Sequence, residues 1–181
     1  MHPLLEEVLK SSSGKRETQA KKTKRAPRSA TTDEELAELL ESVSARILVV
    51  GVGGAGNNAI TRLMEVGVEG AETLAANTDA QDLYFCNSHH KLLLGRETCG
   101  GLGAGNDPDI GEAAAIETYP DIKDAVVGDL VFITAGMGGG TGTGASPIVA
   151  QAAKEVGALV VAFVTSLSLL IRIIINFSAG S

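Results

Sequence analysis

Residues 131–144 read VFITAGMGGGTGTG, and the fold that we predict follows from this stretch. An apolar run suited to a buried strand ends at Thr134, six glycines follow by Gly144, and a helical pattern occupies residues 145–156. A strand, a glycine loop and a helix in this order favour phosphate binding, because backbone N–H groups and the helix dipole both attract an anion. The stretch lacks the lysine of a P-loop, so bound phosphate would contact backbone amides and the hydroxyls of Thr141 and Thr143.

The composition favours a parallel sheet covered by helices. Hydrophobic residues make up 44% of the 181 residues, but aromatic residues make up 3% and tryptophan is absent. The core must therefore consist of Val, Ile, Leu and Ala, which is typical of strands buried on both faces. The two cysteines, Cys86 and Cys99, have no metal-ligand spacing, and we expect free thiols in a reducing compartment.

Charge is distributed unevenly along the chain. Residues 1–30 hold eight Lys or Arg and three Glu, whereas the remainder holds seven basic and nineteen acidic residues. The acidic body argues against nucleic acid as the main ligand. We expect a disordered basic arm over 1–31, either a solubilising tail or a contact for a polyanion. An amphipathic helix over 32–44 would follow, beginning with a capping box and docking against the domain or a partner.

A second glycine motif follows the first predicted strand, residues 46–51. The sequence GVGGAGNN at 51–58 contains G-x-G-x-x-G between a strand and a helix, as in dinucleotide-binding folds. A second strand over 72–77 leads to Asp79, which lies 23 residues after Gly56, where such folds place an acid that binds ribose. The alternative is that these glycines only permit a tight turn from strand to helix.

A third glycine-rich segment follows a predicted strand at 91–94. Residues 95–111 read GRETCGGLGAGNDPDIG, a long loop without predicted secondary structure, and such loops are usually functional. Its Gly-Ala-Gly at 103–105 could surround a phosphate with backbone amides. Asp107 and Asp109 are interpreted as caps of a helix over 110–118, and His89 and His90 as surface residues.

These elements predict one α/β domain with a parallel sheet. Further strands are expected at 129–134 and 158–165, separated by the helix that follows the opening loop, and another helix at 121–127. Right-handed crossovers would place the glycine loops and Asp79 at one edge of the sheet, outside the carboxyl ends of its strands.

Four motifs, in this order and spacing, resemble the nucleotide-binding domain of the FtsZ family, the prokaryotic tubulin homologues of cell division. They are GVGGAGNN at 51–58, AANTDAQ at 75–81, GLGAGNDPDIG at 101–111 and AGMGGGTGTG at 135–144. The resemblance covers residues 46–165, and the acidic helix at 32–43 is similar to extensions of archaeal members. It implies a Rossmann-like parallel sheet of the tubulin/FtsZ type with helices on both faces, incomplete at its C-terminal side.

The resemblance also implies a function. Family members bind GTP or GDP, with Mg²⁺ held through the nucleotide phosphates. They polymerise into filaments at the division septum and hydrolyse GTP at the interfaces between subunits. The expected partners are further copies of the chain, full-length homologues and other division proteins. Specific nucleic acid is not expected, membrane contact would be indirect, and the location would be the cytoplasm at the division site.

The residues carried over from the family motifs form one predicted nucleotide site. They are Gly53, Gly54, Ala55, Gly56, Asn57 and Asn58 in the first loop; Asn77 and Asp79 beside ribose and phosphates; Gly103, Ala104 and Gly105 at the γ-phosphate; and Gly138, Gly139, Gly140, Thr141, Gly142 and Thr143 around the α- and β-phosphates. No metal ligand and no catalytic residue are predicted, because the family's catalytic loop lies beyond the matching segment.

Two segments depart from the family pattern. Cys99 and Gly100 stand where the family usually has Thr and a polar or basic residue. Residues 166–181 match nothing in the family, and we expect a truncated or frame-shifted product with apolar surface left uncovered beyond the fifth strand. The alternatives are a short variant that uses 167–177 as a β-element or partner surface, and a membrane segment over 158–177, where Arg172 is the only charge.

Two further functions stay open beside the GTP-binding division protein. One is a non-catalytic nucleotide-binding regulator that caps filaments of a full-length relative. The other is an NAD-type dinucleotide-binding protein, for which the second and third glycine loops would be unnecessary.

Overall fold

The computed structural model describes Glu35, residues 45–166 and the backbone of residues 171–176. The chain divides into two compact units, Met1–Val43 and Ser44–Ser181, and the fold below belongs to the second. The predicted arm over 1–31 and the predicted helix over 32–44 lie outside the described residues, except that Glu35 is helical and exposed.

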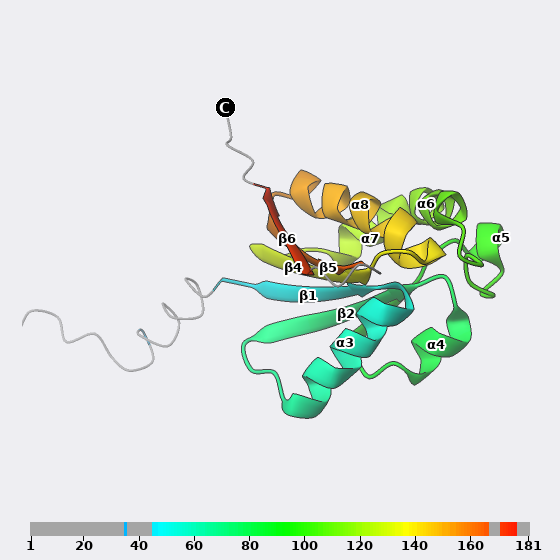
Figure 1. Ribbon diagram of the computed structural model, residues 1–181. Helices are drawn as coiled ribbons and strands as arrows, with labels where there is room; N and C mark the ends of the chain where they lie inside the picture. The colour runs from blue at the N-terminus through cyan, green and yellow to red at the C-terminus, as the bar shows by residue number, and fades with distance from the viewer. Residues whose placement is uncertain (1–34, 36–44, 167–170, 177–181) are drawn as a thin grey trace, which may run out of the picture. The chain divides into compact units, whose positions relative to one another are not determined.

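Six strands of the described segment form one sheet in the order β3-β2-β1-β4-β5-β6 (Figure 1). The strands are β1 (Ile47–Val52), β2 (Ala71–Asn77), β3 (His90–Leu93), β4 (Leu130–Gly136), β5 (Leu159–Thr165) and β6 (Ile171–Asn176). The first five are parallel, which confirms the predicted sheet. β6 runs antiparallel to β5, with Thr165 opposite Ile171 and Val160 opposite Asn176.

β6 corrects the prediction that the sheet ends at its fifth strand. Its backbone pairs along the outer edge of β5, as in the alternative that used 167–177 as a β-element. The alternative of a membrane segment over 158–177 is wrong for the described residues, because Leu159–Thr165 and Ile171–Asn176 are strands. Within the described part of the chain, no helix has the length and apolar character needed to cross a membrane.

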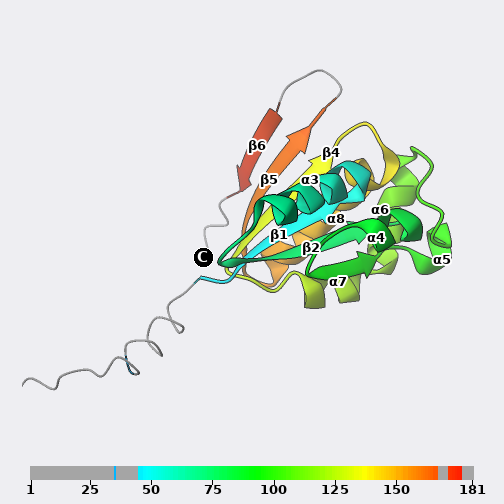
Figure 2. The same ribbon diagram turned by 90° about the horizontal axis from the view of Figure 1, so that it is seen from below.

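Helices cover both faces of the sheet, as predicted. They are α3 (Gly53–Val66), α4 (Ala80–Phe85), α5 (Arg96–Cys99), α6 (Pro108–Glu117), α7 (Tyr119–Ala125) and α8 (Gly140–Glu155). α3 and α4 lie on one face, and α5 to α8 lie on the other (Figures 1 and 2). Each parallel pair of strands is joined across a face, so every strand from β1 to β5 ends at the same edge.

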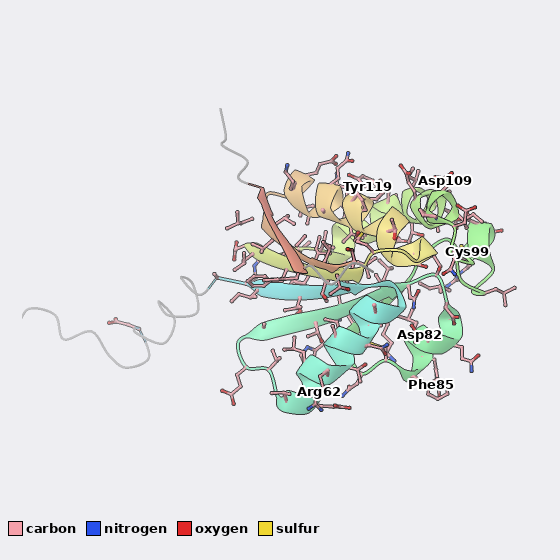
Figure 3. The ribbon with its side chains drawn as sticks, viewed as in Figure 1. Arg62, Asp82, Phe85, Cys99, Asp109 and Tyr119 are labelled. Carbon is pink, nitrogen blue, oxygen red and sulfur yellow. The ribbon has the colours of Figure 1, made fainter. Side chains whose placement is uncertain are left out.

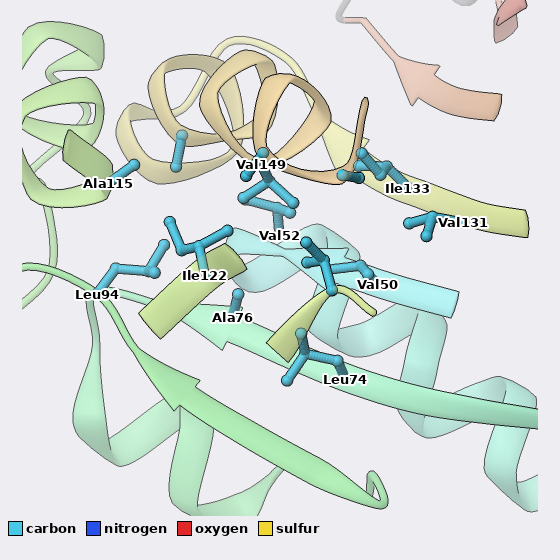
Figure 4. Packing of buried hydrophobic residues seen from close by; sticks show 14 of the residues in the cluster. Val50, Val52, Leu74, Ala76, Leu94, Ala115, Ile122, Val131, Ile133 and Val149 are labelled. Atoms are coloured by element: carbon cyan, nitrogen blue, oxygen red, sulfur yellow. The ribbon is translucent and has the colours of Figure 1, made fainter. Parts of the chain in front are cut away.

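The larger part of the core lies between the sheet and α6, α7 and α8 (Figure 4). Val50 and Val52 of β1 are fully buried there together with Val149 of α8. On the other face Ile60 of α3 packs with Ala75 and other small or aliphatic residues in a smaller cluster. Aliphatic strands buried on both faces account for the scarcity of aromatic residues in the sequence.

Two helix boundaries differ from the prediction. α8 begins at Gly140 rather than Ala145, so three of the glycines of the opening stretch lie inside the helix. Residues 95–111 are not an unstructured loop, because α5 forms within them and α6 begins at Pro108. Glycine normally disfavours a helix, and the reason for its presence in α8 is packing.

Gly142 and Gly144 allow α8 to touch backbone on two sides. A Cβ atom on Gly142 would lie 2.5 Å from the carbonyl oxygen of Gly136 in β4. A Cβ atom on Gly144 would lie 2.0 Å from the carbonyl oxygen of Pro108 at the start of α6. No side chain fits at such distances, so α8 can pack against β4 and α6 only with glycine at these positions.

The substitution Gly144→Ala separates packing from helix propensity. Propensity alone predicts that alanine stabilises the helix by about 1 kcal/mol. The contact with Pro108 predicts the opposite, a loss of about 1–3 kcal/mol, because α6 or α8 must shift. Urea unfolding of both chains measures the difference, and a gain in stability would contradict the packing described here.

Candidate functional site

A cleft of about 1000 Å³ opens at the carboxyl edge of the sheet. It lies where β1, β2, β4 and β5 end and where α3 and α8 begin. Its lining consists of Val52, Gly54, Ala55, Asn77, Asp79, Asp82, Leu102, Gly103, Ala104, Gly105, Asn106, Gly136, Met137, Gly138, Gly139, Gly140, Thr141, Gly142, Thr165 and Ser166. The structure therefore brings segments from all four predicted loops to one place.

Two helices begin at this cleft without side-chain caps. The N-cap residues Val52 of α3 and Gly139 of α8 make no capping hydrogen bond, and neither first turn contains an acid. The first four N–H groups of a helix have no partner within the helix. These amides carry the positive end of two helix dipoles, a combination suited to an anion.

The other helices near the cleft are capped by their own aspartates. Asp79 Oδ1 accepts hydrogen bonds from the backbone of Gln81 and Asp82 at 2.9 and 3.0 Å, and so caps α4. Asp107 accepts from the backbone of Asp109 at 3.0 Å and caps α6. An anion would therefore find unoccupied amides at α3 and α8 but not at α4 or α6.

A third set of amides comes from the loop between α5 and α6. Gly103 and Gly105 adopt positive φ angles of 86° and 57°, which L-residues with side chains rarely adopt. Among the described residues, nothing accepts a hydrogen bond from the N–H of Ala104 or of Gly105. The loop remains anchored, since Gly103 donates to the carbonyl of Thr78 at 3.2 Å and Asp107 to that of Ala104 at 2.9 Å.

The side chains of the cleft carry negative charge. Among the residues that the structure describes, its lining contains Asp79 and Asp82 but no Lys or Arg. Asp82 Oδ2 accepts a hydrogen bond of 2.6 Å from Asn77 Nδ2, which holds the two side chains together at the end of β2. Figure 3 shows Asp82 on α4 and Cys99 on α5 at the same edge of the sheet but on opposite faces. Attraction for an anion must therefore come from the backbone amides.

The threonines of the opening stretch have structural partners. Thr141 Oγ1 lies 2.6 Å from Thr78 Oγ1, a buried hydroxyl pair that joins α8 to the end of β2. Thr143 Oγ1 accepts a hydrogen bond of 2.9 Å from the backbone of Gly138, and it is not part of the lining. Thr141 therefore lines the cleft, whereas Thr143 stabilises the loop before α8 through its hydrogen bond with Gly138.

Several predicted site residues do not line the cleft, namely Gly53, Gly56, Asn57, Asn58 and Thr143. A Cβ atom on Gly56 would lie 2.4 Å from the carbonyl oxygen of Thr134, and one on Gly53 would lie 2.7 Å from the backbone N of Gly142. These two glycines allow α3 to approach β4 and α8 closely. Asn57 is buried with neither polar side-chain atom hydrogen-bonded within the described chain, and Asn58 is exposed.

Other lining residues were not predicted: Val52, Asp82, Leu102, Asn106, Gly136, Met137, Thr165 and Ser166. Asp82 follows Asp79 by three residues, and this helical spacing indicates that the two side chains lie on the same side of the chain. Thr165 ends a parallel strand, and the rule that such strands end at one edge could have found it. The remaining positions depend on how the loops fold and carried no separate signal.

Cys99, which departs from the family pattern, is buried at the end of α5. Burial, and to a smaller extent the charge of Glu117, raises the pKa of its thiol. The thiol therefore stays protonated at neutral pH and serves as a small apolar group beneath the loop.

A family model described as "Tubulin/FtsZ family, GTPase domain" matches residues 46–171, which is more than half of the chain. The chain belongs to the tubulin/FtsZ family. The match includes every loop of the cleft and confirms the family resemblance that the four motifs predicted.

Relatives within the tubulin/FtsZ family support this assignment. Cell division protein FtsZ 1 of Thermococcus kodakarensis is 60% identical over 134 residues, covering 74% of this chain and 36% of the relative. An empty FtsZ dimer from M. jannaschii shares 55% identity, with a TM-score of 0.69 over 73% of this chain and 39% of that one. A GTPγS-bound protofilament of CetZ2 from Haloferax volcanii shares 26% identity, with a TM-score of 0.60 over 66% of this chain and 39% of that one. The chain thus spans between a third and two fifths of these relatives' length.

The hydroxyl pair of Thr78 and Thr141 provides a test of the architecture of the cleft. Thr141→Val keeps the shape but leaves the buried Thr78 hydroxyl without its partner, and we expect a loss of about 1–3 kcal/mol in unfolding free energy. The double variant Thr78→Val/Thr141→Val should lose less than the sum of the single variants. Urea unfolding without ligand measures the unaltered chain, the two single variants and the double variant. Strict additivity of the losses in unfolding free energy would contradict the hydrogen bond.

Proposed function

We propose that this chain binds GTP or GDP in the cleft at the carboxyl edge of the sheet. The observation that carries the proposal is the convergence of two uncapped helix N-termini and the unpaired amides of Ala104 and Gly105 on one cleft. Separate groups of amides suit a chain of several phosphates better than a single anion. Membership of a GTPase family supports the same ligand.

Each segment receives one part of the nucleotide in this proposal. Gly54 and Ala55 at the start of α3, with the stretch 138–142 at the start of α8, hold the α- and β-phosphates. Ala104 and Gly105 hold the γ-phosphate, and Asn77 and Asp79 lie beside ribose and phosphates. The proximity of these segments in the cleft supports the assignment.

Magnesium fits this site as a companion of the phosphates. Among the described residues, no cluster of three or more His, Cys, Asp or Glu is placed to hold a metal ion. Mg²⁺ commonly uses phosphate oxygens and water with only one or two carboxylates, and the cleft offers Asp79 and Asp82. The ion would offset the negative charge that these carboxylates present to the nucleotide.

The fuller form of the proposal is a division protein of the cytoplasm that assembles at the division site and hydrolyses GTP between subunits. The FtsZ dimer and the GTPγS-bound protofilament among the structural relatives support assembly. Leu102 at the rim of the cleft is 88% exposed, which suits contact with a second copy or a full-length homologue. Hydrolysis would be completed by groups of the neighbouring subunit. Contacts with other division proteins would follow assembly. The proposal includes no binding of specific nucleic acid, and any contact with the membrane would be indirect.

The substitution Gly139→Asp tests nucleotide binding without loss of the fold. Gly139 is the N-cap of α8 with an extended φ of −100°, so any residue fits its backbone. Aspartate should cap the helix and raise its stability by roughly a few tenths of a kcal/mol relative to glycine. Its charge should repel phosphate and weaken GTP binding by at least about tenfold. Titration calorimetry with GTP and GDP, and a thermal melt without ligand, measure the two effects.

Gly139→Asn is the matched control, because it has nearly the same shape and caps as well but carries no charge. We expect its GTP affinity to lie much closer to that of the unaltered chain. Failure of the unaltered chain to bind GTP would overturn the proposed function, and binding of NAD in its place would support the dinucleotide alternative.

The second candidate is a non-catalytic regulator that joins and caps filaments of a full-length relative. The exposed Leu102 beside an open cleft favours it, since a nucleotide-bearing face could join the end of a filament. Mixed with the Thermococcus FtsZ 1 in GTP and Mg²⁺, the chain should lower the GTPase rate and the sedimented fraction at substoichiometric ratios. The variant Leu102→Glu should act more weakly, and an unchanged rate and pellet would exclude the capping role.

A further inference from the structure

Glu117, the last residue of α6, connects this helix to α5. Its carboxylate accepts hydrogen bonds from the backbone of Glu97 at 3.0 Å, from the backbone of Thr98 at 2.9 Å and from Thr98 Oγ1 at 2.7 Å. Gly95, the N-cap of α5, makes no side-chain capping bond. A side chain 20 residues away in the sequence therefore supplies the cap of α5.

The neighbouring residue Thr118 secures the same junction. Gly95 donates its backbone N–H to Thr118 Oγ1 at 2.8 Å, and that hydroxyl donates to the carbonyl of Ala114 at 3.0 Å. A Cβ atom on Gly95 would lie 2.3 Å from the Cβ of Ala114, so the start of α5 touches α6 directly. The C-terminal end of α6 thus positions α5 through hydrogen bonds and direct packing.

The position of α5 determines where the loop 100–105 begins. Gly100 donates to the carbonyl of Arg96 at 3.1 Å, and Leu102 donates to that of Cys99 at 3.0 Å. Two residues later come the unpaired amides of Ala104 and Gly105. α5 thus fixes the start of this loop, while the hydrogen bonds from Gly103 to Thr78 and from Asp107 to Ala104 anchor its later part.

The charge of Glu117 strengthens these contacts. Hydrogen bonds from the backbone of Glu97 first, and from the Thr98 side chain and backbone next, lower the pKa of its carboxyl group. The carboxylate is therefore ionised at neutral pH, and hydrogen bonds to an ionised acceptor are shorter and stronger than neutral ones. In the described part of the chain it forms no ion pair with Lys or Arg, so the amides of α5 are its partners.

We propose that Glu117 is a positioning residue for the nucleotide: by capping α5 it fixes the backbone amides of Ala104 and Gly105 at the terminal phosphate. Glu117 touches no ligand itself and acts through α5. The inference rests on the proposed function, because it assumes that a nucleoside triphosphate occupies the cleft. It adds a residue outside the cleft, since Glu117 is not part of the lining.

The test compares Glu117→Ala and Glu117→Gln with the same substitutions at Glu112. Glu112 is exposed on the same helix and has no hydrogen bond or ion pair to the described residues, so it matches the change in charge and helix propensity. Calorimetry with GTP and with GDP, each with Mg²⁺, measures affinity. Hydrogen exchange without nucleotide, resolved to residues 96–106, measures the order of α5 and its loop.

We expect Glu117→Ala to weaken GTP binding by about fivefold and GDP binding by less, since the loop faces the terminal phosphate. Glu117→Gln keeps one acceptor oxygen and should recover part of the affinity. Exchange should accelerate in residues 96–106 of both variants but not at the starts of α3 and α8. The Glu112 variants should match the unaltered chain in both measurements.

Each contrary result has a separate meaning. If the unaltered chain does not bind GTP, the proposed function is overturned. If it binds GTP and Glu117→Ala binds equally well, or if the Glu112 variants lose as much affinity, the positioning role alone is overturned. Should circular dichroism show that Glu117→Ala is unfolded, Glu117→Gln decides the question by the same criteria.

Discussion

Helix α8 lies against the backbone of β4 on one side and of α6 on the other, and the position of the cleft follows from these contacts. Glycines at 142 and 144 leave no atoms between the helix and its neighbours in β4 and α6. The start of α8 therefore lies directly beside the end of the central strand β4. Gly56 and Gly53 do the same for α3, which approaches β4 and α8. Two helix N-termini consequently meet at one edge of the sheet, and the cleft forms between them.

This arrangement decides the electrostatics of the site. The described residues of the cleft include carboxylates and no basic side chain, yet they present several groups of unpaired amides. A P-loop attracts phosphate with a lysine as well as with its backbone. Here the backbone amides have to bind the phosphates without a lysine. Cations that accompany the nucleotide therefore contribute more to neutralising its charge. Such a site is sensitive to backbone position, because an amide cannot reorient as a lysine side chain can. The cap that Glu117 places on α5 is consistent with that requirement.

Much of the fold was predictable because its signals are local. Aliphatic runs marked the five parallel strands to within two residues at either end, with helices on both faces of the sheet. The start of α8 was misplaced because propensity treats Gly140, Gly142 and Gly144 as loop residues, whereas the contact with Pro108 that requires one of them joins two distant segments. α5 was missed for a similar reason. Its cap, Glu117, comes from another helix, and no capping residue near it in the sequence indicates where α5 begins.

The candidate site divides in the same way. The family and the segments that meet at the sheet edge could be predicted from the sequence, because motif spacing and strand order follow from local pattern and chain handedness. Which residues face the cleft became clear only from the three-dimensional packing. It placed Gly54 and Thr141 at the surface of the cleft, and it assigned Gly56 and Thr143 to packing and loop support. A glycine required for close packing and a glycine required for ligand binding cannot be distinguished in the sequence. They differ only in what lies within a few ångströms of the missing Cβ atom.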